Sequence, residues 1–147
     1  MARIRTIKPE SLEAAEFRGF FFGEGHLDLI KQGRTTRGLS PRARIALRED
    51  DVGVLRWVME FLGGNLSYRE STRSYCWQLT GKENITRLLD ILCTGFVPSK
   101  KRKEVWLMVE AVTHVSVRGA HLMDSSVNAL HRIKDELIAA RGFYGAN

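Results

Sequence analysis

The segment from Phe17 to Gly25 constrains the fold of this chain more than any other stretch. If it is helical, Ala15, Gly19 and Gly23 lie four residues apart and form a stripe of minimal side chains on one face. Each glycine inside a helix costs about 0.8–1 kcal/mol relative to alanine. Close approach of a second helix would compensate that cost, and the alternative is a helix with two poorly placed glycines. The opposite side offers aromatic rings to the domain's own core: Phe17, Phe20 and Phe21.

Glu24 stands at the C-terminal end of this helix. The negative end of a helix dipole disfavours a carboxylate there by about 0.3–1 kcal/mol. If two copies of the helix pack through their small residues, two such carboxylates converge, and a bound divalent cation relieves their repulsion. The placement therefore predicts a metal site shared by two chains. The alternative is a glutamate that is simply solvated before a glycine cap.

The charge balance favours a polyanionic partner. The chain has 147 residues, with 23 Lys and Arg against 17 Asp and Glu, which gives a formal charge of +6. This length suits one domain over residues 1–147, and the positive charge favours nucleic acid. No stretch approaches the roughly 18 apolar residues that cross a bilayer, and no hydrophobic signal region follows the basic start, so we expect an intracellular protein without membrane contact. Cys76 and Cys93 stand far apart, which predicts neither a disulfide framework nor a zinc site.

Hydrophobic periodicity predicts alternating helices and strand pairs in an α+β fold. Ser11 is the expected N-cap of the first helix, and Asp50 and Asp51 are expected to cap the second. Gly63 and Gly64 stop the second helix, and Gly95 is the expected end of the third. The expected helices cover 11–25, 50–62, 82–93, a stretch from 99 onward and 125–142, and the expected strands cover 26–32, 41–48, 65–69 and 74–79.

Two sets of apolar residues are expected in the core. The helix from Ser99 presents a stripe formed by Val105, Met108, Val109 and Val112. The three tryptophans lie on or near apolar stripes and are expected to pack inside: Trp57, Trp77 and Trp106.

Alternation also gives the strands one coherent polar face. Arginine can bind guanine and glutamine can bind adenine in the major groove, so this face is a candidate surface for reading DNA bases. The alternative is a solvated strand face. The candidate DNA-binding residues of the strands and the loop between the first two are His26, Asp28, Ile30, Gln32, Arg34, Arg42, Arg44, Arg48, Asn65, Ser67, Arg69, Ser74, Cys76 and Gln78.

Four consecutive cations, Lys100, Lys101, Arg102 and Lys103, open the fourth expected helix. A helix N-terminus is the end where cations are least favoured, so phosphate contact explains the cluster better than helix stability does. A solvated run of charge is the alternative.

The run FRGFFFGEG, followed by an alternating strand, resembles the LAGLIDADG motif of the LAGLIDADG homing endonucleases. The resemblance covers roughly residues 11–110 and implies the family's αββαββα fold, a saddle-shaped antiparallel sheet on DNA, here followed by extra C-terminal helices. It assigns Glu24 and Gly23 to the catalytic metal, Mg²⁺ or another divalent cation such as Mn²⁺. It makes Ala15, Gly19 and Gly23 the dimer interface, and it gives Lys100 or Lys101 a role in the active-site water network.

The chain departs from the family pattern at two positions of the motif. Phe22 replaces an acidic residue, which alters local capping and solvation but not the metal ligand, and Arg18 replaces a small residue and could crowd the helix pair.

The resemblance implies a function as well. A single motif implies a homodimer that cuts both strands of a long palindromic or pseudo-palindromic DNA site by metal-dependent hydrolysis, as in intron or intein mobility. The alternative from the same family is a protein that binds DNA or RNA without cutting, such as a transcriptional regulator or an intron maturase. A small basic α+β protein with an accidental motif is a third possibility. The implied location is the cytoplasm or nucleoid of a prokaryote or phage-infected cell, or an organelle.

Overall fold

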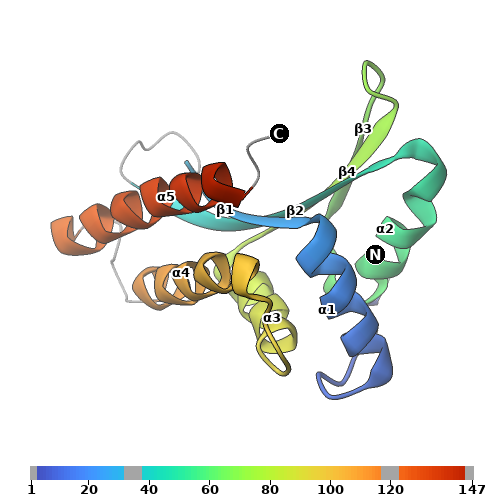
Figure 1. Ribbon diagram of the computed structural model, residues 1–147, viewed down its shortest axis with the longest axis horizontal. Helices are drawn as coiled ribbons and strands as arrows, with labels where there is room; N and C mark the ends of the chain where they lie inside the picture. The colour runs from blue at the N-terminus through green and yellow to red at the C-terminus, as the bar shows by residue number, and fades with distance from the viewer. Residues whose placement is uncertain (1–2, 32–37, 117–122, 145–147) are drawn as a thin grey trace.

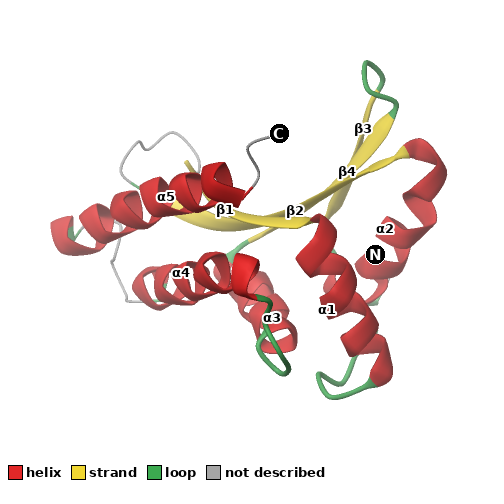
Figure 2. Cartoon of the chain, viewed as in Figure 1, coloured by secondary structure: helices red, strands yellow, loops and turns green. Residues whose placement is uncertain are grey.

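The computed structural model describes residues 3–31, 38–116 and 123–144, the last four without side chains. Helices and strands follow the predicted αββαββα order and are succeeded by two further helices (Figures 1 and 2). The helices are α1 (Leu12–Glu24), α2 (Val52–Leu62), α3 (Lys82–Leu92), α4 (Ser99–Val115) and α5 (Asp124–Tyr144). The strands are β1 (Gly25–Lys31), β2 (Leu39–Arg48), β3 (Asn65–Arg69) and β4 (Ser74–Thr80). None of the described helices is long and apolar enough to span a membrane.

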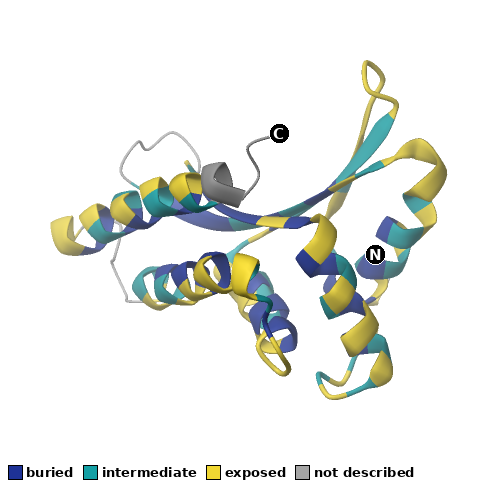
Figure 3. Cartoon of the chain, in the orientation of Figure 1, coloured by how far each residue is buried: buried dark blue, intermediate teal, exposed yellow. Residues whose placement is uncertain are grey.

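The four strands form one antiparallel sheet in the order β1-β2-β4-β3. Figure 1 shows this sheet strongly curved, with α1, α3 and α4 below it in that view. One face of the sheet is buried against the helices and contributes Leu27, Ala43, Ile45, Trp77 and Leu79 to the core. Figure 3 shows stretches of the strands in dark blue, the colour of buried residues. The helices α1, α2 and α3 supply the largest share of the packed side chains, including Phe17, Phe21, Leu55, Val58, Phe61, Ile85 and Leu88.

Helix α1 begins as predicted, because the Ser11 hydroxyl accepts a hydrogen bond from the Ala14 N–H at 3.1 Å. Phe17 and Phe21 are buried as predicted, and Phe22 joins them. Phe20 is only partly buried at the edge of the core.

No residue separates α1 from β1, because the helix ends at Glu24 and the strand begins at Gly25. A Cβ atom at Gly25 would lie 2.5 Å from ring carbons of Phe21. Only glycine therefore fits this junction without displacing a core ring.

The ends of α2 and α3 differ in how well the sequence predicts them. Gly63 stops α2 as predicted, with a φ of 72°. Asp51 occupies the N-cap position of α2, but its side chain makes no capping hydrogen bond, and a 3₁₀ turn over Glu49–Asp51 leads into the helix instead. Helix α3 ends at Leu92 with Cys93 as its C-cap, so the expected stop at Gly95 was wrong.

Two predictions about apolar side chains in α4 were wrong. Trp106 is 52% exposed and Val109 is 37% exposed, although both were expected inside. The buried side of α4 runs through Val105, Met108 and Ala111 instead, because these positions follow one another at the helical spacing. Trp77 is fully buried as predicted, and Trp57 packs partly buried against the core.

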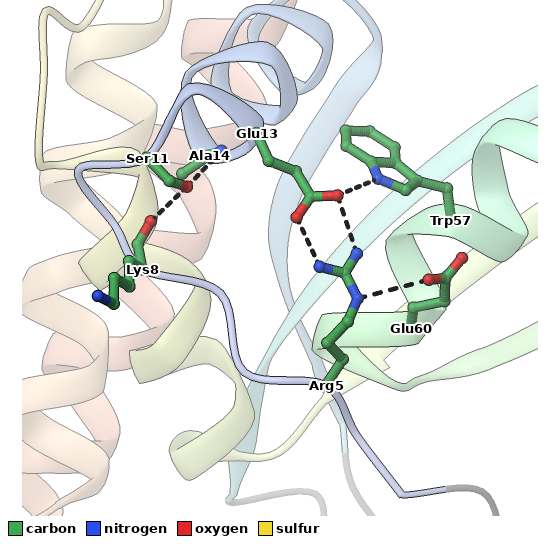
Figure 4. A network of polar contacts seen from close by, with 7 residues as sticks. All are labelled: Arg5, Lys8, Ser11, Glu13, Ala14, Trp57 and Glu60. Atoms are coloured by element: carbon green, nitrogen blue, oxygen red, sulfur yellow. Dashed lines mark hydrogen bonds and ion pairs between the residues drawn. The ribbon is translucent and has the colours of Figure 1, made fainter.

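The residues before α1 are fastened to α1 and α2 by a polar network (Figure 4). Arg5 donates to both carboxylate oxygens of Glu13, at 2.6 and 2.9 Å, and the Trp57 indole N–H donates to the same carboxylate at 2.9 Å. Arg5 also lies 3.5 Å from a carboxylate oxygen of Glu60. These hydrogen bonds, first from Arg5 and then from Trp57, lower the pKa of Glu13 to about 2.

Candidate functional site

The candidate DNA-binding residues of the strands share one face of the sheet, because the strand register aligns them in rows. The first row contains Asp28 and Arg42, followed by Thr80. The second row contains His26, Arg44, Gln78 and Asn65. Ala46, Cys76 and Ser67 form the third row, and Arg48, Ser74 and Arg69 form the fourth. Ile30 lies on the same face opposite Ser40, whereas Gln32 and Arg34 lie outside the described residues.

This polar face carries a preorganised cluster of charges. The Arg42 guanidinium donates from Nε to Asp28 Oδ1 at 2.9 Å and from Nη2 to Oδ2 at 2.7 Å. Arg44 Nη2 lies 3.4 Å from the same Oδ2 atom. These hydrogen bonds to Asp28 raise the pKa of Arg42.

The cluster changes the role expected of Asp28. Asp28 is 6% exposed, and in this conformation its carboxylate is engaged by Arg42 and lies within ion-pair distance of Arg44, so it orients these arginines. The Nη1 atom of Arg42 lies on the edge of the guanidinium that Asp28 leaves open, the edge from which arginine can bind guanine.

Two residues that the sequence singled out separately, Glu24 and Lys101, both lie at the end of α1. Glu24 is exposed at the last position of the helix. The Lys101 ammonium donates to the carbonyl oxygen of Gly25, the next residue, at 2.8 Å. It also lies 3.4 Å from Glu104 Oε2, and its side chain is 13% exposed. An exposed carboxylate and a fixed ammonium at one corner can bind a cation and an anionic oxygen side by side.

The structure distinguishes among the four cations that open α4. Lys101 reaches the end of α1, whereas Lys100 and Lys103 are exposed to solvent. Arg102 is exposed as well and donates to the carbonyl oxygen of Val97 at 3.2 Å. Of the two lysines proposed for the active-site water network, Lys101 is therefore the one held at Gly25, the residue after Glu24.

The stripe of Ala15, Gly19 and Gly23 lies on the exposed side of α1. A Cβ atom added at Gly19 or at Gly23 would meet nothing within 4 Å. Leu12, on the same side, is 77% exposed. Among the described residues, no part of the same chain therefore packs against Gly19 or Gly23.

The two departures within the motif have structural explanations. Phe22 is 5% exposed and belongs to the core, so it fills space without displacing Glu24. Arg18 turns away from the glycine stripe and donates to the carbonyl oxygens of Pro9 at 2.8 Å and Ile91 at 3.4 Å. Within one chain the Arg18 guanidinium is used at the C-terminal end of α3, where a cation is favoured, and whether Arg18 crowds a helix pair stays a prediction.

Glu104 is the residue at this corner that sequence reasoning missed. It is 5% exposed, and its Oε1 atom accepts a hydrogen bond from the Leu27 N–H at 2.7 Å. A charged residue on a helix is ordinarily expected in solvent. The signal that could have found it is its position three residues after Lys101, which places both side chains on one face of α4.

A sequence model described as LAGLIDADG endonuclease matches residues 17–112, which is more than half of the chain. The chain belongs to the LAGLIDADG endonuclease family. The match includes the end of α1, the whole sheet and the Lys101–Glu104 turn of α4. Among curated protein sequences, none matches this LAGLIDADG chain.

Solved structures share the fold of this LAGLIDADG chain. It is similar to the homing endonuclease I-TnaI, with 18% identity and a TM-score of 0.72, covering 92% of this chain and 97% of that one. It is similar to the archaeal intron-encoded homing endonuclease I-Vdi141I in complex with DNA, with 22% identity and a TM-score of 0.72. That match covers 87% of this chain and 83% of the I-Vdi141I chain. It also resembles the meganuclease I-AabMI bound to uncleaved DNA, with 22% identity and a TM-score of 0.70. That match covers 87% of this chain but only 44% of the I-AabMI chain.

Proposed function

We propose that this protein is a site-specific double-strand DNA endonuclease that acts as a homodimer. The observation that carries the proposal is the corner at the end of α1. There Glu24 is exposed while the Lys101 ammonium is held at the adjacent Gly25 carbonyl, and the polar face of the sheet begins two residues later at His26. A carboxylate beside a DNA-binding surface is unfavourable for a protein that only binds DNA, whereas phosphodiester hydrolysis needs one.

The unoccupied face of α1 supports the homodimer. Two copies of this helix can approach closely at Ala15, Gly19 and Gly23, because none of these three residues has a side chain larger than a methyl group. A two-fold axis between the helices would bring the two Glu24 carboxylates toward each other. The symmetry also implies a palindromic or nearly palindromic target, because each chain presents the same residues to its half-site.

The size of the polar face indicates how much DNA one chain covers. The longest strand, β2, has 10 residues. At about 3.3 Å per residue it reaches about 33 Å, which corresponds to about ten base pairs at about 3.4 Å each. A dimer would cover about twenty base pairs, or roughly two turns of the double helix.

The donors at the end of α1 fit a divalent cation such as Mg²⁺ or Mn²⁺. Glu24 supplies a hard, exposed oxygen ligand at the negative end of a helix, and the carbonyl oxygens of the last turn, including Gly23, are of the same kind. Among the described residues, no group of three or more His, Cys, Asp or Glu side chains could hold a metal by itself. We infer that the second Glu24 and the phosphate oxygens of DNA complete the set. When bound, the cation supplies polarisation of the phosphate and a lower pKa for the attacking water.

The chain's own residues would then divide the remaining work. The Asp28-oriented arginines and their neighbours on the polar face bind and align the DNA. Lys101 places a positive charge next to the scissile phosphate and stabilises the negative charge that develops there.

Selection of cleaved sites from a randomised double-stranded DNA library in the presence of Mg²⁺ tests the proposal. We expect symmetric sites of about twenty base pairs, no cleavage when EDTA removes the metal, and a dimer in light scattering. Glu24→Gln should bind the selected site and fail to cut it. Glu83→Gln, at an exposed position at the start of α3, is the matched control and should cut like the wild type.

Other outcomes would count against the proposal. Undiminished cutting by Glu24→Gln would remove this carboxylate from the mechanism, and tight sequence-specific binding without cutting in the wild type would support a regulator or maturase instead. Because the proposed substrate is genomic DNA, we also place the protein inside the cell.

A further inference from the structure

Glu104 is a charged residue in an apolar setting. It lies on α4 between the buried face of that helix and strand β1, next to Val105 and one turn from Met108, and it is 5% exposed. A buried carboxylate is destabilising unless it is paired and hydrogen-bonded. Both oxygens of Glu104 have a partner, since Oε1 accepts from the Leu27 N–H at 2.7 Å and Oε2 lies 3.4 Å from the Lys101 ammonium.

The pair completes the open edge of the sheet. Strand β1 is an edge strand, so alternate backbone groups face away from β2 and need other partners when they are buried. Lys101 donates to the Gly25 carbonyl, and Glu104 accepts from the Leu27 N–H. Residues two apart on a strand and three apart on a helix both lie about 5–7 Å from each other. Lys101 and Glu104, one turn apart on α4, therefore supply the hydrogen-bond partners that a neighbouring strand would otherwise supply to Gly25 and Leu27.

The same contacts fix the Lys101 ammonium at the end of α1. An ammonium group has three N–H donors. Among the described residues, the Gly25 carbonyl and the Glu104 carboxylate take two of them. The third can donate to a phosphate oxygen or a water at the corner where Glu24 is exposed. Without Glu104, the long lysine side chain would lose the only anion that holds it there within the described chain.

We infer that Glu104 is a positioning residue, whose carboxylate holds the Lys101 ammonium at the end of α1 for use in DNA cleavage. The inference rests on the proposed function, because it assigns a task to Lys101 in that reaction. A purely structural role, in which Glu104 only covers the edge of β1, is the competing explanation.

Glu104→Gln separates the two roles. The glutamine amide oxygen can still accept from the Leu27 N–H, so the edge of β1 stays paired, but the negative charge beside Lys101 is gone. Glu110→Gln is the matched control, because Glu110 lies on the same helix, pairs with Arg132 and does not contact the end of α1. Thermal unfolding of both variants checks that each is folded.

The first measurement needs no cleavage activity. The rate at which an amine-acylating reagent modifies each lysine is followed by mass spectrometry in the full chain. We expect Lys101 to react more slowly than the exposed Lys100 in the wild type and to become several-fold faster in Glu104→Gln, with no change in Glu110→Gln. If Lys101 reacts at the same rate in the wild type and in Glu104→Gln, Glu104 does not position it.

The second measurement is the single-turnover cleavage rate with Mg²⁺ on a selected site. Groups that orient active-site residues typically contribute about 10–100-fold, so we expect Glu104→Gln to lose that much in rate with unchanged DNA affinity. The double variant Glu104→Gln/Lys101→Met should lose as much cleavage rate as Lys101→Met alone, because Glu104 acts through Lys101. Losses that multiply would show an independent, structural role. A wild type that cuts no DNA would refute the proposed function, and the labelling rates would still decide the positioning.

Discussion

Replacing Gly19 by alanine separates the stability of one chain from the association of two. Gly19 lies within α1, a helix of 13 residues, on the face shared with Ala15 and Gly23. In a single chain the added methyl group meets nothing within 4 Å. Only helix propensity then changes, and the free energy of unfolding of the isolated chain should rise by about 0.8–1 kcal/mol.

The same methyl group should weaken the dimer. If two α1 helices pack through this stripe, each chain adds one methyl group to a contact that only small residues permit. Overpacking of a close contact costs about 1–3 kcal/mol, which corresponds to a dimer dissociation constant about 5–150-fold larger. The substitution is therefore expected to stabilise the monomer and to destabilise the dimer.

The assay measures both quantities on the same sample. Urea unfolding at protein concentrations below the dimer dissociation constant gives the free energy of unfolding of the single chain. Analytical ultracentrifugation over a dilution series gives the dimer dissociation constant. Gly53→Ala is the control, because Gly53 is a helical glycine of α2 whose Cβ would also meet nothing within 4 Å. It should gain stability without changing association. A Gly19→Ala protein that dimerises as tightly as the wild type would show that this stripe is not the interface.

Four further substitutions test other parts of the structure. Gly25→Ala should destabilise the chain by about 1–3 kcal/mol in urea unfolding, because its Cβ would lie 2.5 Å from the Phe21 ring. The folded-state pKa of Glu13 is about 2, below its usual 4.5, so the stability it contributes is present above pH 4.5 and is lost as the pH falls toward 2. Unfolding of Glu13→Gln should therefore depend less steeply on pH in that window. Trp106→Ala should change stability by less than about 0.5 kcal/mol, whereas Trp77→Ala should cost about 3–5 kcal/mol because Trp77 is fully buried.

Local signals in the sequence were enough to predict the order of the elements. Alternation predicted both hairpins, and Ser11 and Gly63 predicted the start of α1 and the end of α2, because caps and turns depend on a few neighbouring residues. The rows of polar residues on the sheet also followed, since side chains alternate between faces with a period of two.

What the sequence did not reveal depends on contacts between distant residues. Trp106 was expected inside because an apolar ring on a helix usually is, but which side of α4 is buried depends on its docking against other elements. The burial of Asp28 requires the register that places Arg42 opposite it, and the burial of Glu104 requires the edge of β1 beside it. Arg18 follows the same rule, because its partner Ile91 belongs to a different helix.

The direct succession of α1 and β1 would join the proposed cutting site to the proposed recognition surface without a linker. No linker separates Glu24 from the strand that begins at Gly25, so only one residue lies between this carboxylate and His26, the first polar side chain of the sheet. Side chains along the strands can be exchanged to suit a new sequence of bases while this joint stays as it is. Inserting one residue between Glu24 and Gly25 would instead turn every following side chain of β1 to the opposite face of the sheet. The polar side chains of β1 would then no longer lie on the same face as those of the other strands.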